Sequence, residues 1–290
     1  MFRSWKIGTM FGIGIYVHAT FLLLPAFVLL ANLGQIDFAL YTVMMIPAVF
    51  GCVVLHELGH ALTARRYGIE TRDITLYPIG GVARLEKLPE EPVEEFWIAI
   101  AGPAVNVVIA LLFGLTVLST GLNPLIFLNP VIFMGSLTHL SFGQLVLGNL
   151  FAVNLFLAFF NLLPAFPMDG GRVLRALLAT RLGQLRATTI AAQIGVAMAV
   201  VFGLIGLIIN PMLTLLGIFV FFAGQQELAA VRYRYGRRYS EPLDVLPAYE
   251  EELDWPKPTR AGFSGFTWDS GSDRWIEWRN GRPVHSISVN

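Results

Sequence analysis

The run from Phe38 to Ala64 limits what this chain can fold into, because Glu57 is its only formally charged side chain. Such a run exceeds the about 20 apolar residues that span a bilayer, so it predicts a membrane helix. Glu57 belongs to the sequence His56-Glu57-Leu58-Gly59-His60. Histidines four residues apart share one helical face, and the glutamate can take a proton from water, so HExxH indicates a zinc hydrolase. Ionisable groups at membrane depth are usually functional, and we therefore predict a metal site inside the membrane.

The composition indicates a protein with several membrane spans. Of the 290 residues, 55% are hydrophobic and only 14% are charged, which is unusual for a soluble domain. Six apolar stretches reach the length of a span: Ile15 to Leu33, Phe38 to Ala64, Val93 to Ser119, Phe142 to Leu163, Ala187 to Ile209 and Pro211 to Val231. The first has no clear signal-peptidase site, so we expect an uncleaved span. The predicted fold class is an all-α polytopic membrane protein.

The positions of the positive charges predict the topology. None of the 20 Lys and Arg residues lies in three alternate connections, 34–37, 120–141 and the Asn210-Pro211 turn. By the positive-inside rule, we expect a cell-membrane protein with both termini in the cytoplasm. His60 then lies roughly 7 Å, and His56 roughly 13 Å, from Arg65 along a helix. The metal site should therefore be nearer the cytoplasmic face than the midplane.

A tetrahedral zinc that keeps one position for water needs a third protein ligand besides His56 and His60. The best placed acid is Asp169, in the segment Asn161-Leu-Leu-Pro-Ala-Phe-Pro-Met-Asp-Gly-Gly-Arg172 at the cytoplasmic end of the fourth span. Its prolines and glycines break the helix, which at membrane depth requires a backbone buried in protein or lining a cavity. The alternative makes Asp169 the N-cap of a short amphipathic helix from about Gly170 to Arg181. The residues alone favour neither interpretation.

Three motifs together resemble the site-2 protease family of intramembrane zinc metalloproteases. They are HELGH inside a span, Ala101-Gly-Pro-Ala-Val-Asn106, and NLLPAFPMDGGR at the end of a later span. The resemblance covers most of residues 7 to 231. It implies that His56, His60 and Asp169 bind one zinc ion per chain, and that Glu57 activates the water. It also implies that Asn161 lies beside the metal and holds the substrate or the oxyanion.

Two further polar residues have simpler interpretations. Asn106 is either functional or, by default, an amide that bonds between packed helices. Cys52 lies one turn before His56 and is a possible thiolate ligand, but a free cysteine is more often a small packing residue, and we leave it out of the site. With a single cysteine, the chain has no intrachain disulfide.

The connection from Thr71 to Glu86 alternates apolar and polar side chains around Pro78, Gly80 and Gly81, which predicts a β-hairpin at the membrane surface. In the resembling family this region forms a sheet at the catalytic cleft. An exposed strand edge there can bind an extended substrate backbone, and we assign Gly80 and Gly81 to substrate binding. A plain surface hairpin is an equal alternative.

The chain after Val231 differs from the spans, and we divide the chain into a transmembrane metalloprotease domain, 1–231, and a cytosolic segment, 232–290. Basic residues over 232–238 predict anchoring to anionic lipid, and nucleic-acid binding is not expected. An acidic linker follows over 241–258. From Gly265 to Val289, alternation and an Asn280-Gly281 turn predict a small β-hairpin or a three-stranded sheet.

These features predict an intramembrane zinc endopeptidase whose substrate is itself a membrane segment. Because the site is shallow, we expect cleavage in the cytoplasmic third of a transmembrane protein embedded in the lipid bilayer. Family members often carry regulatory CBS or PDZ domains; this chain has a tail too short for the former and no loop for the latter. The alternative is a non-catalytic membrane scaffold or transporter with a structural metal site, which would tolerate loss of Glu57.

Overall fold

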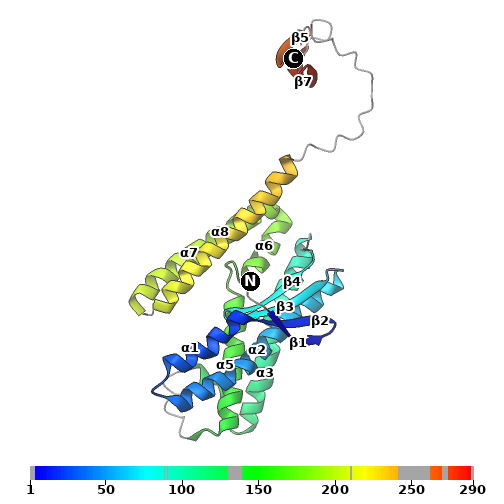
Figure 1. The fold of residues 1–290 in the computed structure, drawn as a ribbon. Coiled ribbons are helices and arrows are strands. Elements are labelled where there is room, and N and C mark those ends of the chain that lie inside the picture. The colour runs from blue at the N-terminus through cyan, green and yellow to red at the C-terminus, as the bar shows by residue number, and fades with distance from the viewer. Residues whose placement is uncertain are drawn as a thin grey trace. The chain divides into compact units, whose positions relative to one another are not determined.

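The computed structural model describes residues 4–87, 89, 91–129, 139–209, 211–240, 262–269 and 274–288. It divides the chain into two compact units, Met1–Tyr235 and Gly236–Asn290. The first unit is mainly helical and carries one sheet, while the second contains a separate small sheet (Figure 1). The acidic linker predicted over 241–258 lies outside the described residues.

Five helices of the first unit are long and apolar enough to cross a membrane, which confirms the predicted helical membrane protein in its main features. They are α2 (Ile36–Arg66), α3 (Pro92–Ser119), α5 (Phe142–Asn161), α7 (Gln184–Ile209) and α8 (Pro211–Ser240). Sequence signals fix several ends. Proline occupies the first turn of α3, and Ser141 and Gln144 form a capping box on α5. Helix α3 packs against both α2 and α5, so it lies at the centre of this bundle.

The span predicted from Ile15 to Leu33 is wrong at its beginning. Residues expected to begin a helix at Ile15 instead belong to strand β2 (Ile13–His18). A short 3-10 turn, η1 (Ala19–Leu22), and helix α1 (Leu23–Ala31) follow, and this apolar stretch is too short to be counted among the spanning helices. The reason is the period-two pattern of Ile13 and Ile15, whose side chains are buried against α2. Six spans are therefore not confirmed.

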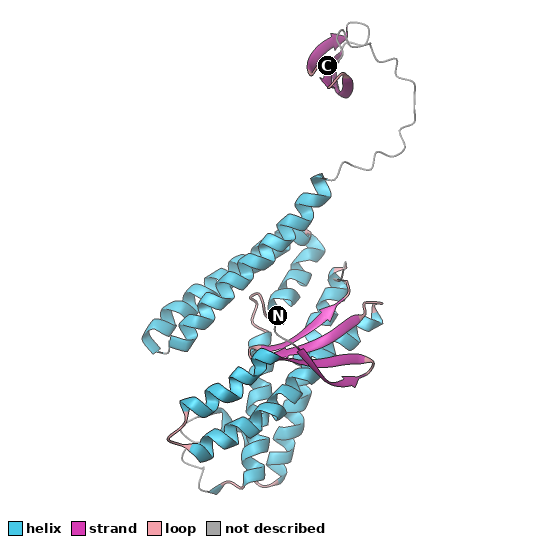
Figure 2. Ribbon diagram, viewed as in Figure 1, coloured by secondary structure: helices cyan, strands magenta, loops and turns pink. Residues whose placement is uncertain are grey.

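A four-stranded sheet in the order β1-β2-β3-β4 covers α2 (Figure 2). Strand β1 (Ser4–Met10) pairs antiparallel with β2, β2 pairs in parallel with β3 (Thr71–Tyr77), and β3 pairs antiparallel with β4 (Gly80–Leu85). The predicted hairpin is confirmed as β3 and β4. Three isoleucines and Leu76 from the sheet join Phe50, Val54 and Leu58 of α2 in one apolar cluster. The sheet therefore lies on the histidine-bearing helix.

After α5 the chain turns without regular structure and enters α6 (Asp169–Leu182), which packs on α3 and α7. Helices α7 and α8 lie side by side (Figure 1). Val220 of α8 is buried in a cluster with Ala199 of α7 and with Ala165 and Met168 from the turn before α6. The helix pair α7 and α8 is therefore joined to the segment that leads into Asp169.

The second unit is a three-stranded antiparallel sheet, as predicted. Its strands are β5 (Gly265–Asp269), β6 (Arg274–Arg279) and β7 (Arg282–Ser288). Asn280 and Gly281 both have positive φ, 49° and 77°, which matches the expected two-residue hairpin turn. Ile276 and Trp278 are buried, and the Trp278 indole donates a hydrogen bond of 2.7 Å to Thr267 Oγ1.

Candidate metal centre

Two histidines on consecutive turns of α2 form one side of the centre. His56 and His60 are each only 6% exposed, and their ring centroids lie 4.7 Å apart. Their Nε2 atoms lie 3.1 Å from each other. The four-residue spacing read from the sequence therefore brings both imidazoles onto one buried helical face.

Asp169 lies on the other side, at the first residue of α6. Pro164 and Pro167 keep the preceding segment out of a helix. A Cβ on Gly170 would lie 2.2 Å from the Leu162 carbonyl oxygen, so only glycine lets α6 begin so close to this turn. The N-cap of α6 is Met168 rather than Asp169. The capping alternative is therefore wrong, and the Asp169 carboxylate faces the histidines instead.

The three side chains direct their ligand atoms at a common point. Asp169 Oδ2 lies 3.1 Å from His60 Nε2 and 3.2 Å from His56 Nε2, so the three atoms form a nearly equilateral triangle. Among the described residues this is the group whose ligand atoms lie close enough together to hold a metal ion. Ligand atoms of a tetrahedral zinc lie about 3.3 Å from one another, given Zn–N distances of about 2.0–2.1 Å. The donor set and its spacing fit zinc with one position left open.

Helix α3 shapes the centre from a third direction. His60 Nδ1 donates a hydrogen bond of 2.6 Å to the carbonyl oxygen of Ile98, which leaves the lone pair of a neutral imidazole on Nε2. One turn later, a Cβ on Gly102 would lie 2.2 Å from His60 Nε2 and 2.7 Å from His56 Nε2. The absence of a side chain at position 102 therefore makes the space in which the two imidazoles meet.

Glu57 lies beside this triangle, against strand β4. Its Oε2 accepts a hydrogen bond of 3.2 Å from the Ala83 backbone N–H. A Cβ on Gly81 would lie 2.9 Å from Glu57 Cγ and 3.0 Å from Val53 Cγ1, so the strand passes directly over the glutamate. The structure thus brings Gly81 and Glu57 together, whereas a Cβ on Gly80 would meet no atom within 4 Å.

Residues 44–202, more than half of the chain, match the sequence model of peptidase family M50. The chain belongs to peptidase family M50. It is 38% identical over 229 residues to a zinc metalloprotease of Methanocaldococcus jannaschii, an alignment that covers 79% of this chain and 61% of the relative. A putative zinc metalloprotease of Synechocystis is 39% identical over 207 residues, covering 67% of this chain and 50% of the relative.

The fold of this M50 chain also resembles a solved structure. The site-2 protease from Methanocaldococcus jannaschii aligns with a TM-score of 0.54 and 35% identity, covering 78% of this chain and 95% of that one. The predicted resemblance to site-2 proteases is therefore confirmed. Together with five long apolar helices, family M50 membership indicates a multi-pass membrane protein. The chain spans 61% and 50% of the lengths of the two curated relatives described above.

Asn161 and Cys52, which the sequence also brought into question, lie outside the triangle of candidate metal ligands. Asn161 is the last residue of α5 and is half-buried, and among the described residues no hydrogen bond joins its side chain to any of the three candidate ligands. Cys52 is buried in an apolar cluster with Met45 and Leu150, in accordance with a packing role.

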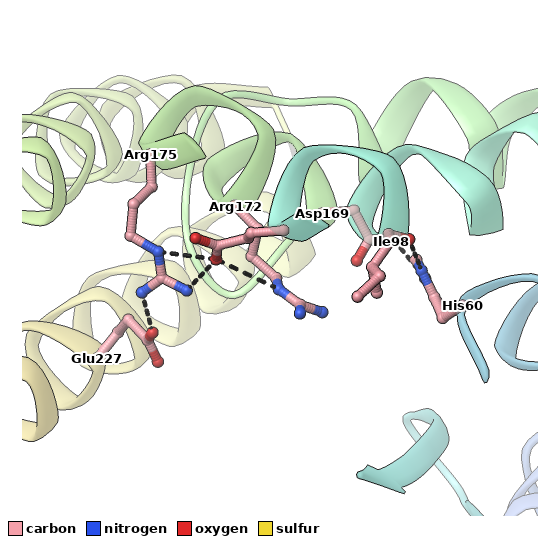
Figure 3. A network of polar contacts seen from close by, with 7 residues as sticks. His60, Ile98, Asp169, Arg172, Arg175 and Glu227 are labelled. Carbon is pink, nitrogen blue, oxygen red and sulfur yellow. Dashed lines mark hydrogen bonds and ion pairs between the residues drawn. The ribbon is translucent and has the colours of Figure 1, made fainter. Parts of the chain in front are cut away.

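A buried ion-pair cluster, which the sequence did not predict, holds α6 in place (Figure 3). Arg175 of α6 contacts Glu95 of α3 and Glu227 of α8 with its guanidinium nitrogens. Arg172 lies 3.9 Å from the same Glu95 carboxylate. Glu95 is 2% exposed and Arg175 is 9% exposed. The cluster ties the helix that begins at Asp169 to the helix that carries Gly102.

Proposed function

We propose that this chain is a zinc-dependent intramembrane endopeptidase that cleaves membrane-protein substrates on the cytoplasmic side of the bilayer. The observation that carries the proposal is the triangle of His56 Nε2, His60 Nε2 and Asp169 Oδ2, with sides of 3.1 to 3.2 Å, among helices long enough to cross a membrane. Membership of family M50 and the names of its zinc metalloprotease relatives support the same activity.

In this proposal His56, His60 and Asp169 hold one zinc ion per chain. When bound, zinc supplies Lewis-acid chemistry that polarises a peptide carbonyl and makes a water molecule more acidic. Glu57, next to His56 in the chain and beside the ligands, takes the proton from that water and later gives it to the leaving amine. Asn161 carries a side-chain amide that can donate a hydrogen bond to the developing oxyanion, and we assign it that role.

The substrate is proposed to bind in extended form along β4. Strand β4 ends the sheet order, so in the described sheet one of its edges has no neighbouring strand. The Ala83 N–H on this edge already points to the Glu57 carboxylate, and Gly81 lies against the same side chain. A strand added here by main-chain hydrogen bonds brings its peptide groups beside Glu57. Gly81, and Gly80 at the start of the strand, leave room for the substrate backbone.

The proposed topology places the site near the cytoplasmic face. Helix α2 ends with Arg65 and Arg66, and α6 carries further arginines just after Asp169. By the positive-inside rule these ends are cytoplasmic, so a substrate helix is cut in its cytoplasmic third. The transmembrane domain, 1–231, would perform this reaction, while the segment 232–290 and both termini lie in the cytosol.

Exchange of Glu57 tests the enzyme against a non-catalytic scaffold or transporter. Glu57→Gln keeps the shape of the side chain but removes the base, so we expect zinc content to be unchanged and cleavage of a co-expressed single-span membrane protein to fall by about 100-fold or more. Glu70→Gln, at an exposed glutamate in the loop before β3, is the control and should cleave normally. Full cleavage by Glu57→Gln would refute the proposed function.

A further inference from the structure

Asn106 is a fully buried amide in direct contact with a candidate metal ligand. Its side chain is 0% exposed, and its Nδ2 lies 3.1 Å from Nδ1 of His56. Its other polar atom, Oδ1, is buried without a hydrogen-bond partner. A buried acceptor with no partner carries the full desolvation penalty, so this arrangement needs an explanation.

The tautomer that His56 needs in order to bind a metal explains the unpartnered oxygen of Asn106. The Nε2 atom of His56 lies in the triangle with His60 Nε2 and Asp169 Oδ2, where it can bind a metal only through its lone pair. A neutral imidazole with the lone pair on Nε2 carries its hydrogen on Nδ1. That hydrogen needs an acceptor, and an NH₂ group does not provide one. The atom of Asn106 that faces His56 in the metal-bound state must therefore be the oxygen.

A rotation of the Asn106 amide accounts for both the unpartnered Oδ1 and the His56 Nδ1–H that needs an acceptor. Turning the side chain by half a turn about its Cβ–Cγ bond exchanges Oδ1 and Nδ2 with almost no change in shape. The oxygen then faces His56 Nδ1 at the observed separation of 3.1 Å and is no longer without a partner. One exchange gives the imidazole hydrogen an acceptor and the amide oxygen a donor, and it moves the amide NH₂ to the position that Oδ1 occupied without a partner.

The residues of α3 that contact the histidines are spaced regularly along the helix. Ile98, Gly102 and Asn106 recur every four residues, so they lie on one face of the helix. The Ile98 carbonyl accepts from His60 Nδ1, Gly102 leaves room for the two Nε2 atoms, and Asn106 faces His56 Nδ1. Each imidazole thus has its own hydrogen-bond partner on α3, one turn to either side of the glycine.

We propose that Asn106 is a positioning residue of the metal centre, whose amide oxygen accepts the His56 Nδ1–H and holds the imidazole in the tautomer that presents Nε2 to the metal. The proposal rests on the proposed function, because it takes His56 as a zinc ligand. It goes beyond the role of a helix-packing amide, which Asn154 of α5 illustrates. Asn154 is equally buried and its Oδ1 also has no hydrogen-bond partner, but its Nδ2 donates a hydrogen bond of 2.8 Å to Leu150 O within its own helix, whereas the Asn106 amide faces His56.

Zinc affinity of the full-length chain in detergent, measured by competition with a chromogenic chelator, tests the proposal. Asn106→Leu keeps the branched shape of the side chain but removes the acceptor, so we expect zinc to bind about 10–100-fold more weakly. Asn106→Asp keeps an oxygen that accepts the same hydrogen, and should bind zinc at least as tightly as the wild type. Asn154→Leu is the matched control and should leave the affinity unchanged.

The two variants of Asn106 keep the proposal falsifiable even if the leucine variant folds poorly. Wild-type affinity in Asn106→Leu would overturn it, and so would an aspartate variant as weak as the leucine variant, because the amide would then act as a donor. If the wild-type chain itself bound no zinc, the proposed function would fall together with this inference. Wild-type zinc binding with no effect of Asn106→Leu overturns the inference alone.

Discussion

Oδ2 of Asp169 lies 3.1 Å from Nε2 of His60, although 109 positions separate the two residues in the chain. The contact exists because α6 packs on α3, and α3 in turn packs on α2. Neither histidine can meet the carboxylate unless all three helices are in place. The candidate metal centre is therefore a product of the helix packing and not of the HExxH motif alone.

Loss of a residue that hydrogen-bonds to a metal ligand usually weakens metal binding by about 10–100-fold. Asp169→Asn should weaken zinc binding by more than this, because it removes a charged ligand. Chelator competition on the purified chain measures this. Asp37→Asn, at an exposed position in the first turn of α2, is the control and should bind zinc normally. An asparagine variant with wild-type affinity would exclude Asp169 as a ligand.

Gly102→Ala should prevent metal binding almost completely. The added methyl group would lie 2.2 Å from His60 Nε2 and 2.6 Å from His60 Cε1, so the imidazole must leave its position or α3 must move. Elemental analysis of the purified chain should therefore find little zinc. Gly51→Ala, on α2, is a matched control because a Cβ there meets no atom within 4 Å. Equal zinc content in both variants would show that metal binding does not require the space left by the missing side chain at Gly102.

The parts of this fold that were predictable from the sequence are those with local signals. A four-residue histidine spacing, an apolar run and an Asn-Gly turn each depend on neighbours in the chain, and each led to the observed α2 or to the hairpin of β6 and β7. Family motifs added Asp169, for which the residues alone left capping as an equal alternative. The helix expected to begin at Ile15, where the structure has strand β2, was a wrong prediction because a run of apolar residues fits a membrane helix and a buried strand equally well.

The supporting contacts could not be predicted because they join residues from different helices. Nothing near Glu95 in the sequence shows that it meets Arg175, which is 80 positions away. Asn106 carried a weak signal, since it lies in the Gly-Pro motif, but its partner His56 is 50 positions away. Such pairings follow from tertiary packing, which the periodicity of a single helix does not contain.

Arg175→Met should destabilise the helical unit by about 3–5 kcal/mol, the usual effect of leaving one partner of a buried ion pair uncompensated. The arginine side chain is 10% exposed and that of Glu95 only 3%, so water cannot replace the lost charge. Reversible unfolding in mixed detergent measures the change. Exchanging both partners, as Arg175→Met with Glu95→Gln, should recover part of the loss because the buried charge of Glu95 is removed too, while Arg172 and Glu227, which also lose a partner, are partly exposed to water.

The pair of Arg84 and Asp73 provides the comparison for that experiment, because the Asp73 side chain, which is 13% exposed, also accepts a hydrogen bond from Thr75 and keeps it when the arginine is exchanged. Its atoms approach as closely as 2.8 Å, but the arginine side chain is 64% exposed. Arg84→Met should therefore change the free energy of unfolding by no more than about 1 kcal/mol. If both arginine variants lost the same amount, burial would not be what makes the Arg175 cluster important.

Gly81→Val should reduce cleavage while zinc binding remains unchanged. A Cβ at this position would lie 2.9 Å from Glu57 Cγ and 3.0 Å from Val53 Cγ1, so β4 must move away from the glutamate, and the proposed substrate strand moves with it. Because a shift of about 1 Å can lower a rate by about 100-fold, we expect kcat/KM to fall strongly. Val82→Ala, at the next and half-exposed residue of the strand, is the control. Unchanged cleavage by Gly81→Val would mean that the substrate does not depend on the position of β4, and loss of zinc from this variant would place Gly81 in support of the metal ligands instead.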